Sequence, residues 1–184
     1  MRLCWGRKTV LRRRRFPETR TFSTVRSPWR FIRSSINSTK AVRPTLHLKV
    51  APLQNPERYQ ALASALTTLT ADILGKRPEV TAVIIDELPA ARWYVGGRDA
   101  QCPTALLEIS ITQDTNTAEE KAAFIQAAFA ELQRQLGHTT GQLEEASYVI
   151  VREVAASDWG YGGQTQLARR NTRQVSVWPL PAAR

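Results

Sequence analysis

The stretch PTLHLKV at residues 44–50 begins the patterned part of this chain. Leu46, Leu48 and Val50 alternate with polar residues, as expected of a strand that buries one face. A helical pattern of about five turns follows, from an N-cap and a proline at Asn55-Pro56 to a closing glycine at Gly75. Its apolar stripe has spacings of four, three and four residues and consists of Leu62, Leu66, Leu69 and Ile73.

Two further elements complete this unit. Val83-Ile84-Ile85 is a continuous apolar run, which predicts a strand covered on both faces. Gly96 and Gly97 end the stretch RWYVGG at residues 92–97, and a glycine pair permits a tight turn.

The same order recurs in the second half of the chain. Pro103-Thr104 repeats Pro44-Thr45, and a second alternating strand follows with Ala105, Leu107 and Ile109. Thr117 and Glu120 form a capping-box pattern. The next elements are a helical stripe of Phe124, Ala128, Leu132 and Leu136, a closing glycine at Gly137, a strand at 148–151 and an aromatic-glycine turn at 158–163. The drift in spacing is confined to loops, which indicates a duplicated β-α-β unit.

The duplication predicts the fold class. A crossover helix makes the two strands of each unit parallel, and a unit of about 60 residues has too small a core to be stable alone. We therefore expect an α/β (α+β) fold in which tandem β-α-β repeats form one four-stranded mixed sheet with both helices on one face. The other face is open, and we expect neighbouring subunits to cover its apolar side chains.

These features together resemble the 4-oxalocrotonate tautomerase family of the tautomerase superfamily. The resemblance rests on Pro-Thr at the start of the first strand of each repeat, the long helix, the second strand and the aromatic-glycine-glycine turn. Because the set occurs twice, over residues 44–168, the chain is similar to the fused members. The resemblance implies a tautomerase/MIF-like fold, a homotrimer and a cofactor-independent isomerase.

The resemblance also implies a catalytic residue. In this family an amino-terminal proline is the general base that moves a proton in enolisable 2-oxo acids, and Pro44 matches that position. Its nitrogen is an amide while Arg43 precedes it, so we expect the active protein to begin at Pro44. Pro103 is internal and is assigned a structural role. The alternative is that Pro44 merely starts a strand.

Candidate substrate-binding residues follow from the same comparison. Trp93 occupies the place of the family's apolar wall, and Trp159 is its counterpart in the second half; core or interface packing is the alternative for both. The family's arginines are absent from their usual positions. The candidate replacements for carboxylate binding are Arg58, Arg92, Arg98 and Arg152, each of which could also be a solvated surface charge.

Net charge is unevenly distributed along the 184 residues. The chain has 26 Lys+Arg against 16 Asp+Glu, but residues 1–43 carry +12 while residues 44–168 carry −6. The patterned body therefore offers nucleic acid no extended basic surface, and a nucleic-acid arm at residues 1–43 is the weakest interpretation. No apolar run approaches the roughly 18 residues of a membrane span. His47 and His138 lack ligand partners at metal-binding spacing, so no metal site is expected.

Residues 1–43 form a basic, unpatterned extension. The composition is typical of an organelle transit peptide, and that interpretation predicts mitochondrial localisation. If residues 1–43 are instead a disordered tail, or sequence upstream of the true start codon, we expect a cytoplasmic protein. The body comprises repeat 1 at 44–102 and repeat 2 at 103–168, and residues 169–184 are interpreted as a C-terminal tail.

Three functional classes remain open on the sequence. The first is a tautomerase of 2-oxo acids or enols with Pro44 as base. The second is a dehalogenase/hydratase or decarboxylase of the same superfamily. The third is a non-catalytic oligomeric binding protein that keeps the fold.

Overall fold

The computed structural model describes residues 43–51, 57–137 and 142–175. The chain divides into two units, residues 1–37 and 38–184, and every described residue belongs to the second. The expected N-cap at Asn55-Pro56 lies outside the described residues.

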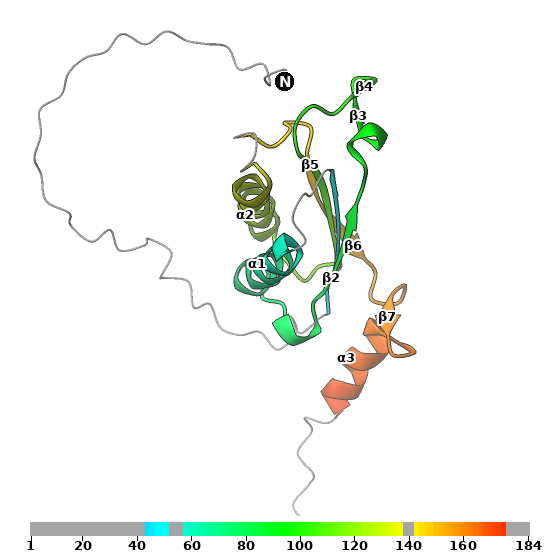
Figure 1. The fold of residues 1–184 in the computed structure, drawn as a ribbon. Coiled ribbons are helices and arrows are strands. Elements are labelled where there is room, and N and C mark those ends of the chain that lie inside the picture. Colours follow the sequence, from blue (N-terminus) through cyan, green and yellow to red (C-terminus); the bar gives the residue numbers. More distant parts are fainter. Residues whose placement is uncertain (1–42, 52–56, 138–141, 176–184) are drawn as a thin grey trace, which may run out of the picture. The chain divides into compact units, whose positions relative to one another are not determined.

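A four-stranded mixed sheet forms the centre of this unit, as the duplication predicted (Figure 1). The strand order is β2-β1-β5-β6. Parallel pairs join β1 to β2 and β5 to β6, while β1 and β5 are antiparallel. The bounds of the strands are Thr45–Ala51 for β1, Ala82–Glu87 for β2, Thr104–Thr112 for β5 and Tyr148–Val154 for β6.

Both long helices, α1 (Glu57–Leu74) and α2 (Ala118–Leu136), cover the same face of the sheet (Figure 1). The alternating strand residues point at them and are buried, which confirms the predicted pattern. Leu69 and Ile73 are only partly buried, because Thr70 and Leu74 share the inward face of α1. The buried apolar core consists of Leu46, Leu48, Val50, Leu62, Leu66, Leu74, Ala105, Leu107, Ile109, Ile111, Phe124, Ala128, Leu132, Leu136 and Leu143.

The helix ends follow the sequence signals. Thr117 caps α2 by accepting a hydrogen bond from the backbone N–H of Glu120, whose carboxylate accepts one in return. Gly75 follows α1 with a φ of 65°, a conformation that costs glycine little. Gly137 ends α2 in a right-handed conformation.

Each repeat ends in a short hairpin. Hairpin 1, residues 93–100, contains β3 (Tyr94–Val95) and β4 (Arg98–Asp99), and hairpin 2, residues 159–166, contains β7 (Gly160–Tyr161) and β8 (Gln164–Thr165). Both turns are glycine pairs with positive φ angles, which confirms the tight turns. Two 3-10 turns, η2 (Pro78–Val80) and η3 (Ala90–Arg92), flank β2.

The expectation that Val83–Ile85 is covered on both faces is wrong for this chain. β2 is an edge strand, and Ile84 is 44% exposed on the face that carries no helix. That open face is also more polar than expected: it mixes Ile84 with His47, Lys49 and the ion-paired Glu108 and Arg152. The apolar half of each alternation faces the helices instead.

A third helix, α3 (Gln166–Val175), follows hairpin 2 directly. It spans position 168, where the sequence analysis ended the duplicated body, so ordered structure extends into the segment interpreted as a tail. None of the helices in the described ranges is long and apolar enough to cross a membrane.

Candidate active site

The two prolines lie at opposite ends of the sheet because β1 and β5 are antiparallel. Thr45, next to Pro44, is opposite Ser110 near the end of β5, whereas Pro103 precedes the start of β5. Hairpin 1 follows β2 and hairpin 2 follows β6, so they also lie at opposite ends (Figure 1). The Pro44 end therefore receives hairpin 2, and the Pro103 end receives hairpin 1.

Pro44 is buried at the start of β1. Its carbonyl accepts a hydrogen bond from the backbone N–H of Ala82 at 3.2 Å, which fixes it to the start of β2. Continuing the β1–β5 register places Ile111 beside Pro44 and Thr112 beside Arg43. The nitrogen of Pro44 is a tertiary amide in the Arg43–Pro44 peptide bond, so it has no basic lone pair in this chain.

An arginine–aromatic stack lies immediately before Pro44. The guanidinium carbon of Arg43 is 3.6 Å from the centre of the Tyr161 ring in hairpin 2, and that of Arg169 is 3.8 Å from it. Two guanidinium groups at such distances must lie on opposite faces of one ring. Arg169 also donates to the Tyr161 carbonyl at 3.0 Å. Hairpin 2 and α3 thus bring an aromatic ring and the cation Arg169 to the residue that precedes Pro44.

Several buried donors and one hydroxyl at this end have no hydrogen-bond partner within the part of the chain that the structure describes. The hydroxyl is that of Thr112, a residue with 0% exposure at the end of β5. The donors are the indole N–H of Trp159, the side-chain amide of Gln166, and guanidinium N–H groups of Arg169 and Arg170. Buried polar groups in proteins are normally paired, so an unpaired set in one region indicates a site that awaits a polar ligand.

Arg152 is at the Pro44 end of the sheet but is already paired. It lies on the open face of β6 in the row that joins Thr45, Ser110 and Arg152 across three strands. Its guanidinium donates to the carboxylate of Glu108 on the neighbouring strand, with the Nε–Oε1 distance at 3.2 Å. A substrate carboxylate must compete with Glu108 for this cation.

The other predicted arginines lie at the opposite end within this chain. Arg58, in the first turn of α1, donates to the Gln135 carbonyl at 2.7 Å and so ties α1 to the end of α2. Arg92 and Arg98 are exposed at η3 and in β4, and Trp93 is half-buried at the start of hairpin 1. None of these four residues meets Pro44 of its own chain.

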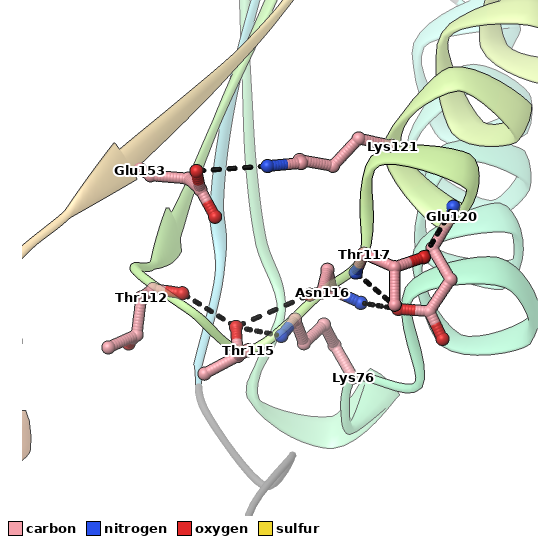
Figure 2. Close-up of polar contacts among 8 residues, drawn as sticks. All are labelled: Lys76, Thr112, Thr115, Asn116, Thr117, Glu120, Lys121 and Glu153. Carbon is pink, nitrogen blue, oxygen red and sulfur yellow. Dashed lines mark hydrogen bonds and ion pairs between the residues drawn. The ribbon is translucent and has the colours of Figure 1, made fainter.

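A polar network holds the end of β5 that lies beside Pro44 (Figure 2). Lys76 is 3% exposed and donates to the Thr115 hydroxyl at 2.9 Å, which in turn donates to the Thr112 carbonyl at 2.6 Å. Asn116 donates to the Leu74 carbonyl at 3.0 Å. These bonds join the end of α1 to the loop between β5 and α2, so Thr112 is held in a fixed position.

Sequence reasoning missed the contribution of α3. Gln166, Arg169 and Arg170 were not proposed as site residues, and the two arginines fall in the segment interpreted as a C-terminal tail. Their spacing of three and four residues is nevertheless a helical stripe, and it follows the glycine turn without a break. That spacing, together with the arginines, was the available signal.

Comparisons with known proteins agree with this architecture. Residues 44–99 match the family model described as tautomerase enzyme. The curated protein "Probable tautomerase K2" from Dickeya dadantii (strain 3937) is 44% identical over 41 residues, which are 22% of this chain. The matched part spans 61% of that relative's length.

Two solved structures show the similarity over both repeats. A native fused 4-OT is 28% identical with a TM-score of 0.54, and the match covers 67% of this chain and 97% of that one. A wild-type fused 4-OT symmetric trimer is 24% identical with a TM-score of 0.59, over 68% of this chain and 98% of that one. These comparisons bear out the resemblance to the 4-oxalocrotonate tautomerase family: residues 44–99 match the tautomerase family model, and the two-repeat fold is similar to that of the fused 4-OT proteins.

Proposed function

We propose that the protein is a cofactor-independent tautomerase that moves a proton in enolisable 2-oxo acids, with Pro44 as general base once its nitrogen is the chain terminus. The proline abstracts a proton from the carbon next to the oxo group and returns it at the alternative position. The match of residues 44–99 to the tautomerase family model supports the isomerase class. Proton transfer in 2-oxo acids and the role of Pro44 as its base are what we propose.

One observation carries this proposal. Pro44 is a buried residue at the start of the folded body, and the residue before it stacks on Tyr161 of hairpin 2. A chain that begins at Pro44 would present a secondary amine at the place now occupied by the Arg43 peptide bond. That amine would lie at the end of the sheet where Tyr161 and Arg169 also lie.

This environment suits a general base. An α-amino group has a pKa of about 8 in water. Burial and a neighbouring cation both disfavour its protonated form and lower that pKa, so a larger fraction is neutral near pH 7. Cations in the same place also stabilise the negative charge that develops on the enolate oxygen. Trp159 supplies apolar surface that limits access of water.

The proposed assembly is a homotrimer. The similar fused 4-OT described as a symmetric trimer supports it, as does the open sheet face with exposed Ile84 and Tyr148. In such an assembly, Trp93, Arg92 and Arg98 could reach Pro44 only from a neighbouring subunit, because hairpin 1 lies at the other end of its own sheet. Light scattering that gives a monomer mass at micromolar concentration would contradict this part.

The test compares two chains that differ by one residue at the amino terminus. A chain that begins at Pro44 should ketonise phenylenolpyruvate, and one that retains Arg43 should not. Pro44→Ala in the shorter chain should lose most of the rate, because a primary amine replaces the secondary amine in an altered strand start. Equal rates for the two chains would exclude proline catalysis. N-terminal sequencing of the mature natural protein shows which form exists.

A second candidate is a non-catalytic binding protein. The Arg43–Pro44 peptide bond favours it, because an amide nitrogen cannot act as a base. An amine-selective reagent separates the two: covalent addition at residue 44 of the mature protein supports the enzyme, and its failure supports the binding protein. A substrate panel of halogenated acrylates and β-keto acids separates a tautomerase from a dehalogenase/hydratase or a decarboxylase.

A further inference from the structure

We infer that hairpin 2 and the start of α3 form a carboxylate-binding site made of Trp159, Gln166, Arg169 and Arg170. Its ligand is the carboxylate of the 2-oxo acid on which Pro44 acts, and this identity of the ligand rests on the proposed function. The site differs from the arginine candidates suggested by the sequence, since three of its four residues belong to α3.

The backbone brings these four side chains together. Gln166, Arg169 and Arg170 are spaced three and four residues apart and therefore share one face of α3. The Gln166 N–H donates to the Trp159 carbonyl at 3.0 Å, which places Trp159 beside the start of the helix. The Leu167 N–H donates to the Ala156 carbonyl at 2.9 Å and fixes the helix against the β6–β7 connection.

Several buried donors of this face have no acceptor among the described residues. The buried Trp159 Nε1, Gln166 Nε2, Arg169 Nε, and Arg170 Nε and Nη2 have no hydrogen-bond partner. Gln166 is only 5% exposed, so its amide is not satisfied by bulk water. Leaving so many donors buried and unpaired costs free energy, which a ligand with several acceptor oxygens would recover.

Charge also favours an anion over a neutral ligand. Residues 166–175 contain no acid, and within the described ranges neither Arg169 nor Arg170 forms an ion pair. The acid nearest in sequence, Asp158, accepts a hydrogen bond from the Ser157 hydroxyl at 2.5 Å. A carboxylate has two acceptor oxygens that match the planar fork of a guanidinium group.

One aromatic ring connects the site to Arg43, the residue before Pro44. Arg169 lies on one face of Tyr161, at 3.8 Å, and Arg43 lies on the other, at 3.6 Å. The site and Pro44 therefore lie at the same end of the sheet. The arrangement supplies, from an element outside the duplicated unit, the cations that the family's usual positions lack in this chain.

The test is calorimetric titration of the full chain with phenylpyruvate and with its neutral methyl ester. The acid should bind, the ester should not, and Arg170→Gln should weaken binding of the acid about 10- to 100-fold, the effect of losing a charge-assisted hydrogen bond. Arg170 is the sharpest probe because no hydrogen bond to the rest of the described fold is lost with it. Arg77→Gln, which removes one exposed positive charge elsewhere, should leave the affinity unchanged.

Three outcomes would overturn the inference. The first is equal binding of the acid and the ester, and the second is full affinity of Arg170→Gln for phenylpyruvate. The third is an Arg170→Gln variant whose assembly mass changes in light scattering while its affinity for phenylpyruvate does not. The last would mean that the unpaired donors bind a second copy of the chain. Binding is measured with the Arg43–Pro44 bond intact, so it does not depend on proline chemistry. If phenylpyruvate binds as expected but a chain starting at Pro44 is inactive, only the proposed function fails.

Discussion

Arg58 was proposed from sequence as a substrate-binding residue, and its contacts predict a structural role instead. Its guanidinium donates to the backbone carbonyl of Gln135 at 2.7 Å, in the last turn of α2. Such carbonyls lack a partner within the helix, and a cation there also interacts favourably with the helix dipole. The bond links two helices whose positions are 77 residues apart. Replacing Arg58 by Met removes the bond and keeps most of the aliphatic stem.

The expected loss follows from these contacts. A hydrogen bond to a charged group contributes about 1.5–3 kcal/mol to the free energy of unfolding. The guanidinium is partly exposed and the freed carbonyl can gain water, so we take about 2 kcal/mol. For a chain of this size, each kcal/mol lowers the Tm by about 2–4 °C. Arg58→Met should therefore lower the Tm by about 4–8 °C.

The assay is thermal unfolding followed by circular dichroism, with Arg77→Met as the matched control. Arg77 has a side chain that is 53% exposed and, among the described residues, forms an ion pair only with Glu79 nearby in sequence, so its loss should change the Tm little. Arg58→Lys keeps the charge and should recover part of the loss. A wild-type Tm in Arg58→Met, together with a raised KM for phenylenolpyruvate, would refute the structural role.

Three further predictions concern stability and the site. Thr117→Ala removes the capping box of α2 and should cost about 1 kcal/mol, measured by urea unfolding; no loss would mean that water replaces the cap. Hydrogen bonds from Arg134 hold the pKa of Glu131 below its usual value of 4.5. Stability from this carboxylate is therefore present above pH 4.5 and lost as the pH falls through the lower folded pKa, so Glu131→Gln should flatten the decline of Tm below pH 4.5, and an unchanged decline would contradict this. Gly160→Ala places a Cβ 2.0 Å from the Gln164 carbonyl oxygen. It should distort hairpin 2, cost about 1–3 kcal/mol and weaken phenylpyruvate binding, whereas an unaltered affinity would separate the hairpin from the site.

The sequence predicted only part of the candidate site. Pro44, Trp159 and Arg152 do lie at one end of the sheet. Trp93 and Arg58 do not, because the repeats pair through antiparallel strands and each proline end receives the hairpin of the other repeat. Two copies of one motif look equivalent in sequence, and nothing local indicates which copy faces which. Arg169 and Arg170 were missed for a related reason, since the duplication has no position for α3.

The sequence by itself determined the strands, helices and turns of the two repeats and their duplication. Alternation at residues 45–50 and 104–109, the stripes of the two helices and the glycine turns are local patterns, and each is set by side-chain period and backbone sterics. Tertiary structure decided the strand order, the exposed edge at Ile84 and the grouping of unpaired donors at the start of α3. These features depend on contacts between residues far apart in the chain, where the free energy of pairing and burial has no signature in any single segment.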